Sequence, residues 1–456
     1  MAPPSICEIV ERDEAGNITA TYVASGKYRV DVILPEASKS HVKQLLDVFL
    51  PAGFPQSVTD DYIQYQIYDS LQAFSSSIAG MLASRAVLEG VGVGDSTASP
   101  TAALLLSVLQ DSMGRIATIL FAHRLGTALE PECKMYRFAA DVFNDTAIVL
   151  DCLSPAFPKA VRVAILSFSS ILRSLCGVCA GSAKASLSAH FARKGNLGEV
   201  NAKDSSQETV ISLLGMLAGS IVVSWVSTPM ATWSTLIALL SIHLATNYAA
   251  VRAVSMRCLN RQRANIVFSN MMQNGRVLRP AEVAKRERIF DRDGILRWSD
   301  DKIIGRCKIG VSLHTLLSHV GSQRKDTGSL DSRAVSMPAL LAVFADEGYI
   351  MWPGYSPDDE CLIVLKDGCT TIDQLKAWTH ALSVMKVAQE RSSEDKQEGN
   401  DVSQVTARLT EIERTLEETR NLFENYSETL KDQGWDLDVV ALGTRPGTTV
   451  HVGSRI

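Results

Sequence analysis

The pattern of hydrophobic and polar residues changes twice along the chain. The first 50 residues contain two short alternating segments, ITATYVAS and YRVDVILPE, with EAGN as a turn upstream of the first, and they predict a small β element. Long stretches rich in Ala, Ser, Gly and Leu follow, separated by Gly or Pro, and they predict helices. We expect six helices, at about 60–90, 98–126, 133–153, 158–192, 205–227 and 230–258.

Beyond residue 263 the chain becomes charged. GYIMWPGYSPDDECLIVLKDG followed by TIDQLKAWTHALSVMKVAQE predicts a hairpin that leads into an amphipathic helix. RSSEDKQEGNDVSQ is typical of a solvated linker, and VTARLTEIERTLEETRNLFENYSETLKDQGW has Leu and Ile at helical spacing. The predicted fold class is therefore mainly α, with a β element over 1–50, a six-helix apolar domain over 51–263, an α+β domain over 264–390, and a linker, amphipathic helix and tail over 391–456.

The helical part is apolar enough to raise the question of a membrane. A spanning helix needs about 20 mostly apolar residues. Residues 210–228 and 231–251 approach that length, contain no Asp, Glu, Lys or Arg, and are joined at Pro229. The other four predicted helices are long enough but carry charges. A large soluble helical domain is the alternative interpretation.

Paired glycines favour the membrane interpretation. Glycines four residues apart let helix backbones approach closely, a packing device of helices in lipid. The pairs are Gly90 and Gly94, Gly177 and Gly181, and Gly215 and Gly219. After the last apolar helix the chain is dense in Arg and Lys, and the positive-inside tendency then places the C-terminal domain in the cytosol. We therefore expect a transmembrane helical domain.

Composition narrows the function class. The 456 residues carry a formal charge of −5, with a pI near 6.0 and a mean hydropathy of +0.07. This charge provides no basic field for nucleic acid, so we expect no nucleic-acid partner. The start, MAPPSICEIVERDEAGN, lacks a basic segment followed by an apolar run, so we expect no cleaved signal peptide. Nine scattered cysteines suit reduced, buried thiols, and CGVC at 176–179 has no βαβ pattern around it.

Carboxylates interrupt the third predicted helix, KMYRFAADVFNDTAIVLDCLSP. Asp141, Asn144 and Asp145 lie at offsets of 0, 3 and 4, so they share one helical face, and Asp151 lies about 80° from Asn144 around the axis at ~100° per residue. Arg137 extends this face. A carboxylate at mid-bilayer costs at least ~2.5 kcal/mol, so the face is excluded from lipid.

This acidic face has two interpretations. It is either a path for a solute or proton, balanced by Arg85, Arg115 or Arg173, or an ion-pair and capping network that holds the helices together. His243 and Asn247, four residues apart on the sixth predicted helix, can join either network. Both interpretations place the acids inside the domain.

Two other polar segments have competing interpretations. In LQDSMGR, Asp111 and Arg115 either pair along one helix, or Gly114 breaks the helix and the two residues mark a loop. NLGEVNAKDSSQET lacks the spacing of a phosphate loop. It is typical of a polar loop with a capping box at Asp204 or Ser205 and Glu208, with Lys203 able to meet an anion at the helix start.

Several blocks together resemble one family. AGFPQSVTDDYIQYQIYDSLQAFSSSIAGMLASRAVLEG, KMYRFAADVFNDTAIVLDCLSP, NLGEVNAKDSSQET and HLATNYAAVRAVSMRCLNRQR are similar to the root UVB sensitive (RUS) family, over about residues 50 to 263. The resemblance implies a membrane-associated protein connected with the response to UV-B and with vitamin B6 homeostasis. It carries over no catalytic residue, because no reaction is established for the family.

Motifs for catalysis are not found in the sequence. It has no HExxH, GxSxG or Cys/His metal spacing, and no GxGxxG after a strand, so we expect no enzyme, no cofactor and no metal. An enzyme acting on a vitamin B6 intermediate is the weakest hypothesis. The leading one is a carrier-like membrane protein for a small polar solute. The alternative is a non-catalytic, membrane-associated scaffold that binds a protein partner through its C-terminal domain. The partners considered are membrane lipid, a small polar solute, and a protein partner or a homo- or hetero-oligomer.

Overall fold

The described residues form two compact units, each considered by itself. The structure, a computed structural model, describes residues 7–12, 18–25, 29–33, 48–91, 99–193, 195–320, 322–323, 330–331, 336–354, 359–394, 401–443 and 447–453. One unit contains the described residues up to Leu120 and Tyr136–Val254. The other contains Phe121–Met135 and the described residues from Ser255 onward.

A small antiparallel sheet opens the described chain. Strands β1 (Cys7–Arg12), β2 (Ile18–Ser25) and β3 (Arg29–Ile33) pair in that order. The two alternating segments of the sequence supply β2 and β3, so the predicted β element is confirmed. The predicted turn EAGN lies outside the described residues.

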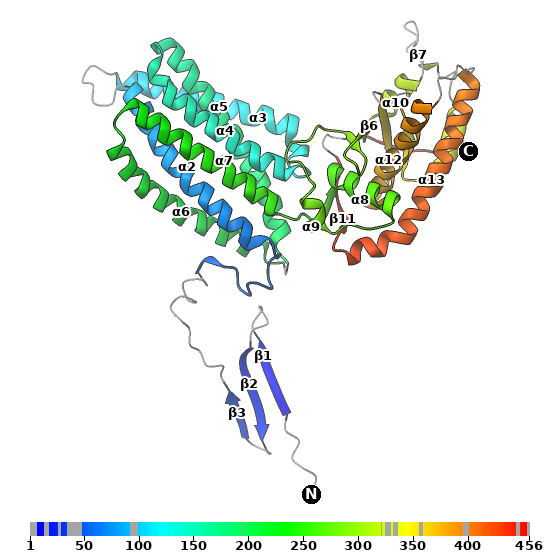
Figure 1. Cartoon of the computed structure of the whole chain (residues 1–456), viewed down its shortest axis with the longest axis horizontal. Coiled ribbons are helices and arrows are strands. Elements are labelled where there is room, and N and C mark those ends of the chain that lie inside the picture. The colour runs from blue at the N-terminus through cyan, green and yellow to red at the C-terminus, as the bar shows by residue number, and fades with distance from the viewer. Residues whose placement is uncertain are drawn as a thin grey trace. The chain divides into compact units, whose positions relative to one another are not determined.

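Six long helices make up the rest of this unit and run alongside one another (Figure 1). They are α2 (Tyr62–Val91), α3 (Pro100–Leu125), α4 (Cys133–Leu153), α5 (Lys159–Phe191), α6 (Leu197–Trp225) and α7 (Pro229–Ala253). Short 3-10 turns, η1 (Gly126–Ala128) and η2 (Ser154–Ala156), follow α3 and α4. Thr228 caps α7 by accepting from Ala231 N, and Pro229 occupies its first turn, where its missing N–H costs nothing.

The start of α6 corrects the sequence prediction. The segment NLGEVNAKDSSQET is helical from Leu197, so Asp204 and Ser205 do not cap a helix. Asp204 lies mid-helix, where it accepts a hydrogen bond from Gln66 Nε2 at 2.8 Å. Lys203 Nζ donates to Val48 O at 3.0 Å. A capping box is predicted from neighbouring residues alone, and here Asp204 is instead held within the helix by a partner on another helix.

Among the described residues, four helices, not six, are long and apolar enough to cross a membrane by length and composition. They are Thr101–Ala128, Lys159–Phe191, Leu197–Trp225 and Pro229–Ala253. The helices α2 and α4 fail this criterion because they carry most of the polar side chains that face the inside of the bundle. Large apolar side chains on the four helices are exposed, including Trp225 at 83% and Met230 at 79%.

Glycines mark where α2 and α6 approach closely. A Cβ at Gly215 would lie 2.6 Å from Ser77 Cβ, and one at Gly219 would lie 3.3 Å from Ile78 Cα. At Gly177 and Gly181 a Cβ would meet nothing within 4 Å, so the tight contact expected there is not formed. Spacing alone therefore does not separate a packed glycine pair from an open one.

The second unit is built around a mixed sheet. Its strands are β5 (Ile295–Arg297), β6 (Ile303–Ile309), β9 (Tyr349–Trp352), β10 (Glu360–Lys366) and β12 (Thr449–Val450). The strand β10 pairs in parallel with β6 and β12 and antiparallel with β9, which confirms the predicted hairpin. Two smaller pairs join β4 (Cys258–Asn260) to β11 (Asp436–Ala441), and β7 (Ser322–Gln323) to β8 (Leu330–Asp331).

Helices enclose this sheet. They are α8 (Arg261–Asn274), α9 (Pro280–Ala284), α10 (Leu313–Val320), α11 (Met337–Val343), α12 (Thr371–Glu394) and α13 (Asp401–Asp432). The core contains Phe268, Trp352 and Trp378 in one buried cluster, with Leu416 and Phe423 of α13. The predicted solvated linker is shorter than expected, because α12 extends to Glu394 and α13 begins at Asp401, and residues 395–400 lie outside the described chain.

Candidate functional site

A polar cavity of about 340 Å³ lies inside the helical unit. Its walls come from α2, α4, α5, α6 and α7, and they combine charged, amide and hydroxyl side chains. The charged and amide residues that line it are Asp69, Gln72, Arg137, Asp141, Asn144, Arg173, Lys184, Asp204, Glu208 and His243. The bundle is thus polar inside and apolar outside.

Arg137 of α4 organises the buried end of the cavity. Its Nη2 lies 2.6 Å from Asp69 Oδ1 of α2, and its Nη1 lies 3.0 Å from Asp141 Oδ1, one turn along α4. The guanidinium also contacts the Tyr65 hydroxyl, at 3.4 Å from Nε. One cation therefore holds two carboxylates from two helices, and all of these groups are largely buried.

His243 of α7 bridges two acids of α4. Its Nδ1 lies 2.7 Å from Asp145 Oδ1, and its Nε2 lies 3.4 Å from Asp141 Oδ2. In the orientation that satisfies its neighbours, the Gln72 amide donates to His243 Nε2 at 2.7 Å and to Asp141 Oδ2 at 2.8 Å. The Nδ1–H of a neutral imidazole then donates to Asp145. Asn247 also donates to Asp141, so α2, α4 and α7 are joined by one polar network.

The ion pairs that α5 makes along the cavity are more exposed. Lys184 Nζ of α5 lies 2.6 Å from Asp204 Oδ2 and 2.8 Å from Glu208 Oε2, both on α6. Arg173 of α5 pairs with Asp151 of α4. The side chains of Glu208 and Arg173 are 56% and 43% exposed, whereas that of His243 is 1% exposed. The cavity wall thus combines half-exposed and buried side chains.

Six of the eight polar residues singled out in the sequence lie in this network. They are Arg137, Asp141, Asn144, Asp145, His243 and Asn247. Asp111 and Arg115 do not belong to it, since both are exposed on α3. The structure shows no ion pair between these two, and α3 continues through Gly114, so neither interpretation of that segment is correct.

The proposed balancing cations have different roles. Arg173 does pair with an acid of α4, but Arg85 donates to Val223 O at 3.0 Å and Val226 O at 2.7 Å, at the end of α6. Sequence reasoning missed Tyr65, Asp69 and Gln72. Their spacing of four and three residues on α2 is the signal that could have placed them on one face.

A second buried charge cluster lies in the other unit. Glu287 pairs with Lys134 and, at 2.9 Å from its Oε1, with Arg263 Nη1. Burial opposes ionisation of this carboxyl, but the Lys134 ammonium and the Arg263 guanidinium outweigh it and hold the pKa of Glu287 below its ordinary value. Arg263 also donates to Cys258 O at 2.7 Å. This cluster lines none of the described cavities.

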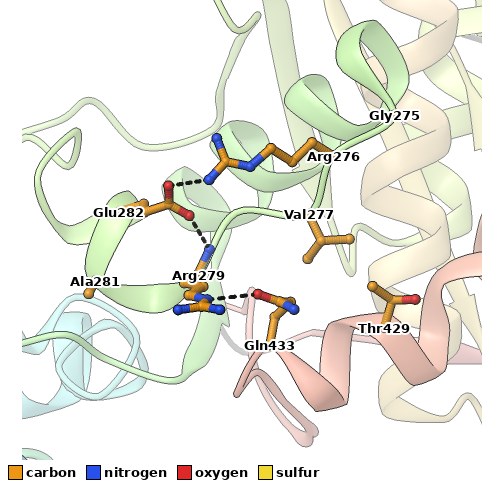
Figure 2. A pocket seen from close by; sticks show the side chains of 8 residues that line it. All are labelled: Gly275, Arg276, Val277, Arg279, Ala281, Glu282, Thr429 and Gln433. Carbon is orange, nitrogen blue, oxygen red and sulfur yellow. Dashed lines mark hydrogen bonds and ion pairs between the residues drawn. The ribbon is translucent and has the colours of Figure 1, made fainter.

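An open groove of about 610 Å³ lies on the second unit, between the end of α8, α9 and the end of α13. Figure 2 shows that its charged groups are engaged with one another. Arg276 Nη2 contacts Glu282 Oε1, and Arg279 Nε donates to Gln433 Oε1 at 3.0 Å. The groove is open to the surface, and its lining is more apolar than polar.

The described residues give little support for metal binding or for thiol chemistry in the cavity. They contain no group of three or more His, Cys, Asp or Glu side chains that could hold a metal ion. The CGVC cysteines lie within α5 as free thiols, with Cys179 buried and Cys176 on the cavity wall. The cavity's chemistry is therefore that of charge and hydrogen bonding.

Comparison with known proteins assigns the chain to a family. Residues 35–275 match the family model described as a vitamin B6 photo-protection and homoeostasis domain, and residues 276–445 match the one described as the C-terminal part of root UVB sensitive proteins. The chain belongs to the root UVB sensitive family. No solved structure matches it.

Relatives in the RUS family come from an amoeba and a plant. The chain is 38% identical over 292 residues to RUS family member 1 of Dictyostelium discoideum, which covers 62% of this chain and 55% of that protein. It is 36% identical over 303 residues to protein root UVB sensitive 3 of Arabidopsis thaliana, covering 65% and 68%. The chain thus spans about half of the Dictyostelium relative. The cavity lies wholly within the first matched RUS domain.

Proposed function

We propose that the chain is a carrier-like membrane protein that binds a small polar solute in the cavity of its helical unit. The observation that carries this proposal is the distribution of polarity: polar and charged side chains from five helices surround a cavity, while large apolar side chains cover the outside of the same bundle. A cavity of this volume is in the range of small-molecule sites. In this proposal lipid covers the apolar faces, and the C-terminal unit lies in the cytosol.

The description of the matched domain indicates which solutes to try first. It names vitamin B6 homoeostasis, so the B6 vitamers are the first panel for a transport assay. The protein is reconstituted in liposomes, and uptake of each labelled vitamer is compared with empty liposomes. Uptake above that background supports the proposal, and background uptake of the whole panel removes B6 vitamers as the solute.

A cavity-filling variant tests whether uptake depends on this site. Gly80 lines the cavity and a Cβ there meets nothing within 4 Å, so the ring in Gly80→Trp can enter the cavity without a backbone clash. Gly177→Trp is the matched control, because Gly177 is exposed on α5 and also has open space around it. We expect uptake to be lost in Gly80→Trp and kept in Gly177→Trp. Equal uptake by both variants would place the path elsewhere.

The groove of the second unit favours a second candidate, a scaffold that binds a protein partner through that unit. The groove is open, and it presents two arginines to the surface (Figure 2). Arg279→Glu reverses one of these charges and would weaken partner binding. The same variant should leave solute uptake unchanged if the carrier proposal is correct.

A further inference from the structure

We infer that the solute of the helical cavity is a small organic cation, an ammonium-bearing molecule. The inference rests on the proposed function, since it names the class of solute that this cavity would take. It is drawn from the charges around the cavity, the pairing of its cations, and the acceptor atoms left over in its buried network.

The first observation is an excess of carboxylates. The side chains that line the cavity, or pair with a lining residue, include six carboxylates among the described residues: Asp69, Asp141, Asp145, Asp151, Asp204 and Glu208. Three permanent cations oppose them, which are Arg137, Arg173 and Lys184. Protonation of His243 would reduce the excess by one and leave it acidic. Inside an apolar bundle such an excess attracts a positive charge.

The second observation concerns the cations, because each of them is already engaged. Arg137 and Lys184 each hold two carboxylates, and Arg173 holds one. At Arg137 an anionic solute would have to displace Asp69 or Asp141 and leave that carboxylate unpaired in a buried site, which is costly. A cationic solute instead meets pairs of carboxylates, each pair sharing one cation.

The third observation is a shortage of donors at the buried end. Asp145 Oδ2 and Asn247 Oδ1 are buried and accept no hydrogen bond from the described residues. Asp145 is 5% exposed, and both residues contact groups of the cavity wall, Asp145 through His243 and Asn247 through Asp141. An ammonium group carries up to three N–H donors and no acceptor, so it suits a network that is rich in acceptors.

The size of the cavity favours an organic cation over a bare metal ion. About 340 Å³ is far more than one ion needs, and hydroxyls of Ser76, Ser77 and Ser212 add hydrogen-bonding groups along the wall. The described residues also lack a cluster suited to a metal ion. The expected solute therefore has an ammonium group on a polar organic body.

A matched set of ligands tests the charge preference. Tyramine, tyrosol and 4-hydroxyphenylacetate share one ring and carry an ammonium, a hydroxyl and a carboxylate. Binding of each to the full chain in lipid nanodiscs is measured by calorimetry, with empty nanodiscs as the blank. We expect tyramine to bind at least about tenfold more tightly than tyrosol, since one charge-assisted hydrogen bond is worth roughly that ratio, and 4-hydroxyphenylacetate to bind most weakly.

Charge-neutralising variants test which carboxylates are responsible for the preference for a cation. Glu208→Gln keeps the shape of a lining side chain and should weaken tyramine binding about tenfold while leaving tyrosol binding unchanged. Asp111→Asn is the control, because Asp111 is exposed on α3 away from the cavity and its loss should change neither ligand. Asp145→Asn, whose carboxylate reaches the cavity wall through His243, is the second variant and replaces Glu208→Gln if the latter lowers the yield of folded protein.

Three results would overturn the inference: equal or tighter binding of 4-hydroxyphenylacetate, no binding of any of the three ligands, or tyramine selectivity unaffected by both Asp145→Asn and Glu208→Gln. Each leaves the proposed function standing if solute uptake remains sensitive to Gly80→Trp. Loss of that sensitivity, with the tyramine preference intact, would instead show that the cavity binds cations without transporting them.

Discussion

The two units of the molecule distribute polarity in opposite ways. In the C-terminal unit Trp352 and Trp378 are fully buried within one continuous core, as in a protein folded in water. In the helical unit Trp225 and Met230 are exposed, while carboxylates and guanidinium groups line an internal cavity. The long apolar helices belong to the helical unit, whereas the C-terminal unit buries shorter apolar segments in its core. This contrast is what the proposed membrane-embedded carrier requires of its helical unit.

The buried charges differ in the same way. Glu287 in the C-terminal unit has two cationic partners and lines none of the described cavities, so its cluster holds the fold together. In the helical unit Asp141 shares its cation with Asp69 and lines a cavity. A buried charge is weak evidence of function when every partner is satisfied, and stronger evidence when acids outnumber cations around a cavity.

The largest expected effects come from removing one partner of each buried cluster. Glu287→Ala leaves Lys134 and Arg263 without their shared carboxylate, and Asp141→Ala leaves Arg137 with one acid instead of two. Breaking a buried pair costs ~3–5 kcal/mol, so we expect folded protein to be largely lost in Glu287→Ala.

Asp141→Ala tests the contrast between the two buried clusters, because Asp69 still pairs with Arg137 in this variant. We expect this variant to lose less stability than Glu287→Ala. Chemical denaturation of the purified proteins measures both, each unit being followed by its own tryptophans. Equal stability of Glu287→Ala and the wild type would contradict the structural role of that cluster.

Helix packing in the helical unit predicts the next largest effect. Gly219→Leu places a side chain against Met81 and Ile78 of α2, and overpacking of this kind costs typically 1–3 kcal/mol. Gly177→Leu is the matched control, because its side chain enters open space. The melting temperature in detergent should fall for Gly219→Leu alone. A similar melting temperature for both variants would show that the α2–α6 contact is not tight.

A pH dependence is expected of the C-terminal unit. His380 donates from Nε2 to Ile412 O at 3.1 Å, and its Nδ1 lies 3.0 Å from the Tyr349 hydroxyl. Burial lowers the pKa of His380 to about 3, so the folded protein keeps this imidazole neutral while the unfolded chain protonates it below about pH 6.5.

The unfolded state thus binds more protons in this range, and stability falls as the pH is lowered from about 6.5 towards 3. The slope from one such group reaches about 1.4 kcal/mol per pH unit. His380→Gln removes the group, so unfolding of the variant, followed at a series of pH values, should show a shallower slope. A slope identical to that of the wild type would mean that His380 is not the group responsible.

The smallest effect is expected at the polar residues that lie outside the cavity. Asp111 and Arg115 are exposed on α3, so Asp111→Asn with Arg115→Gln should change the free energy of unfolding by less than about 0.5 kcal/mol. Solute uptake should also be unchanged. Loss of uptake in this double variant would extend the path to α3 and weaken the contrast between the cavity wall and the outer surface.

The spacing of residues along one helix predicted which side chains share a face of that helix. It did not predict contacts whose partners lie on another helix. Asp141, Asn144 and Asp145 were placed on one face because three- and four-residue steps require it. Asp69 and Gln72 were missed because their importance depends on the approach of α2 to α4 and α7. Asp204 resembled a helix cap in sequence, but its partners lie on other helices. Gln66 is more than a hundred and twenty residues away along the chain, and Lys184 is about twenty residues away.

The number of membrane-length helices was overestimated for a related reason. Helix length alone does not distinguish a helix that faces lipid from one that lines a polar interior. The helices α2 and α4 are long, but their polar side chains face Arg137 and His243 within the bundle. Their composition already separates them from the four candidate spans, which meet the criterion for both length and apolar content.

Extraction of membranes with alkaline carbonate tests most directly whether the helical unit is built for lipid. The full chain is expressed in its host, and the washed membranes are separated into pellet and supernatant after treatment. We expect the chain to remain in the pellet, because the apolar faces of α3, α5, α6 and α7 would lie in lipid. Quantitative release of the chain into the supernatant would contradict a membrane-embedded helical unit and, with it, the carrier proposal.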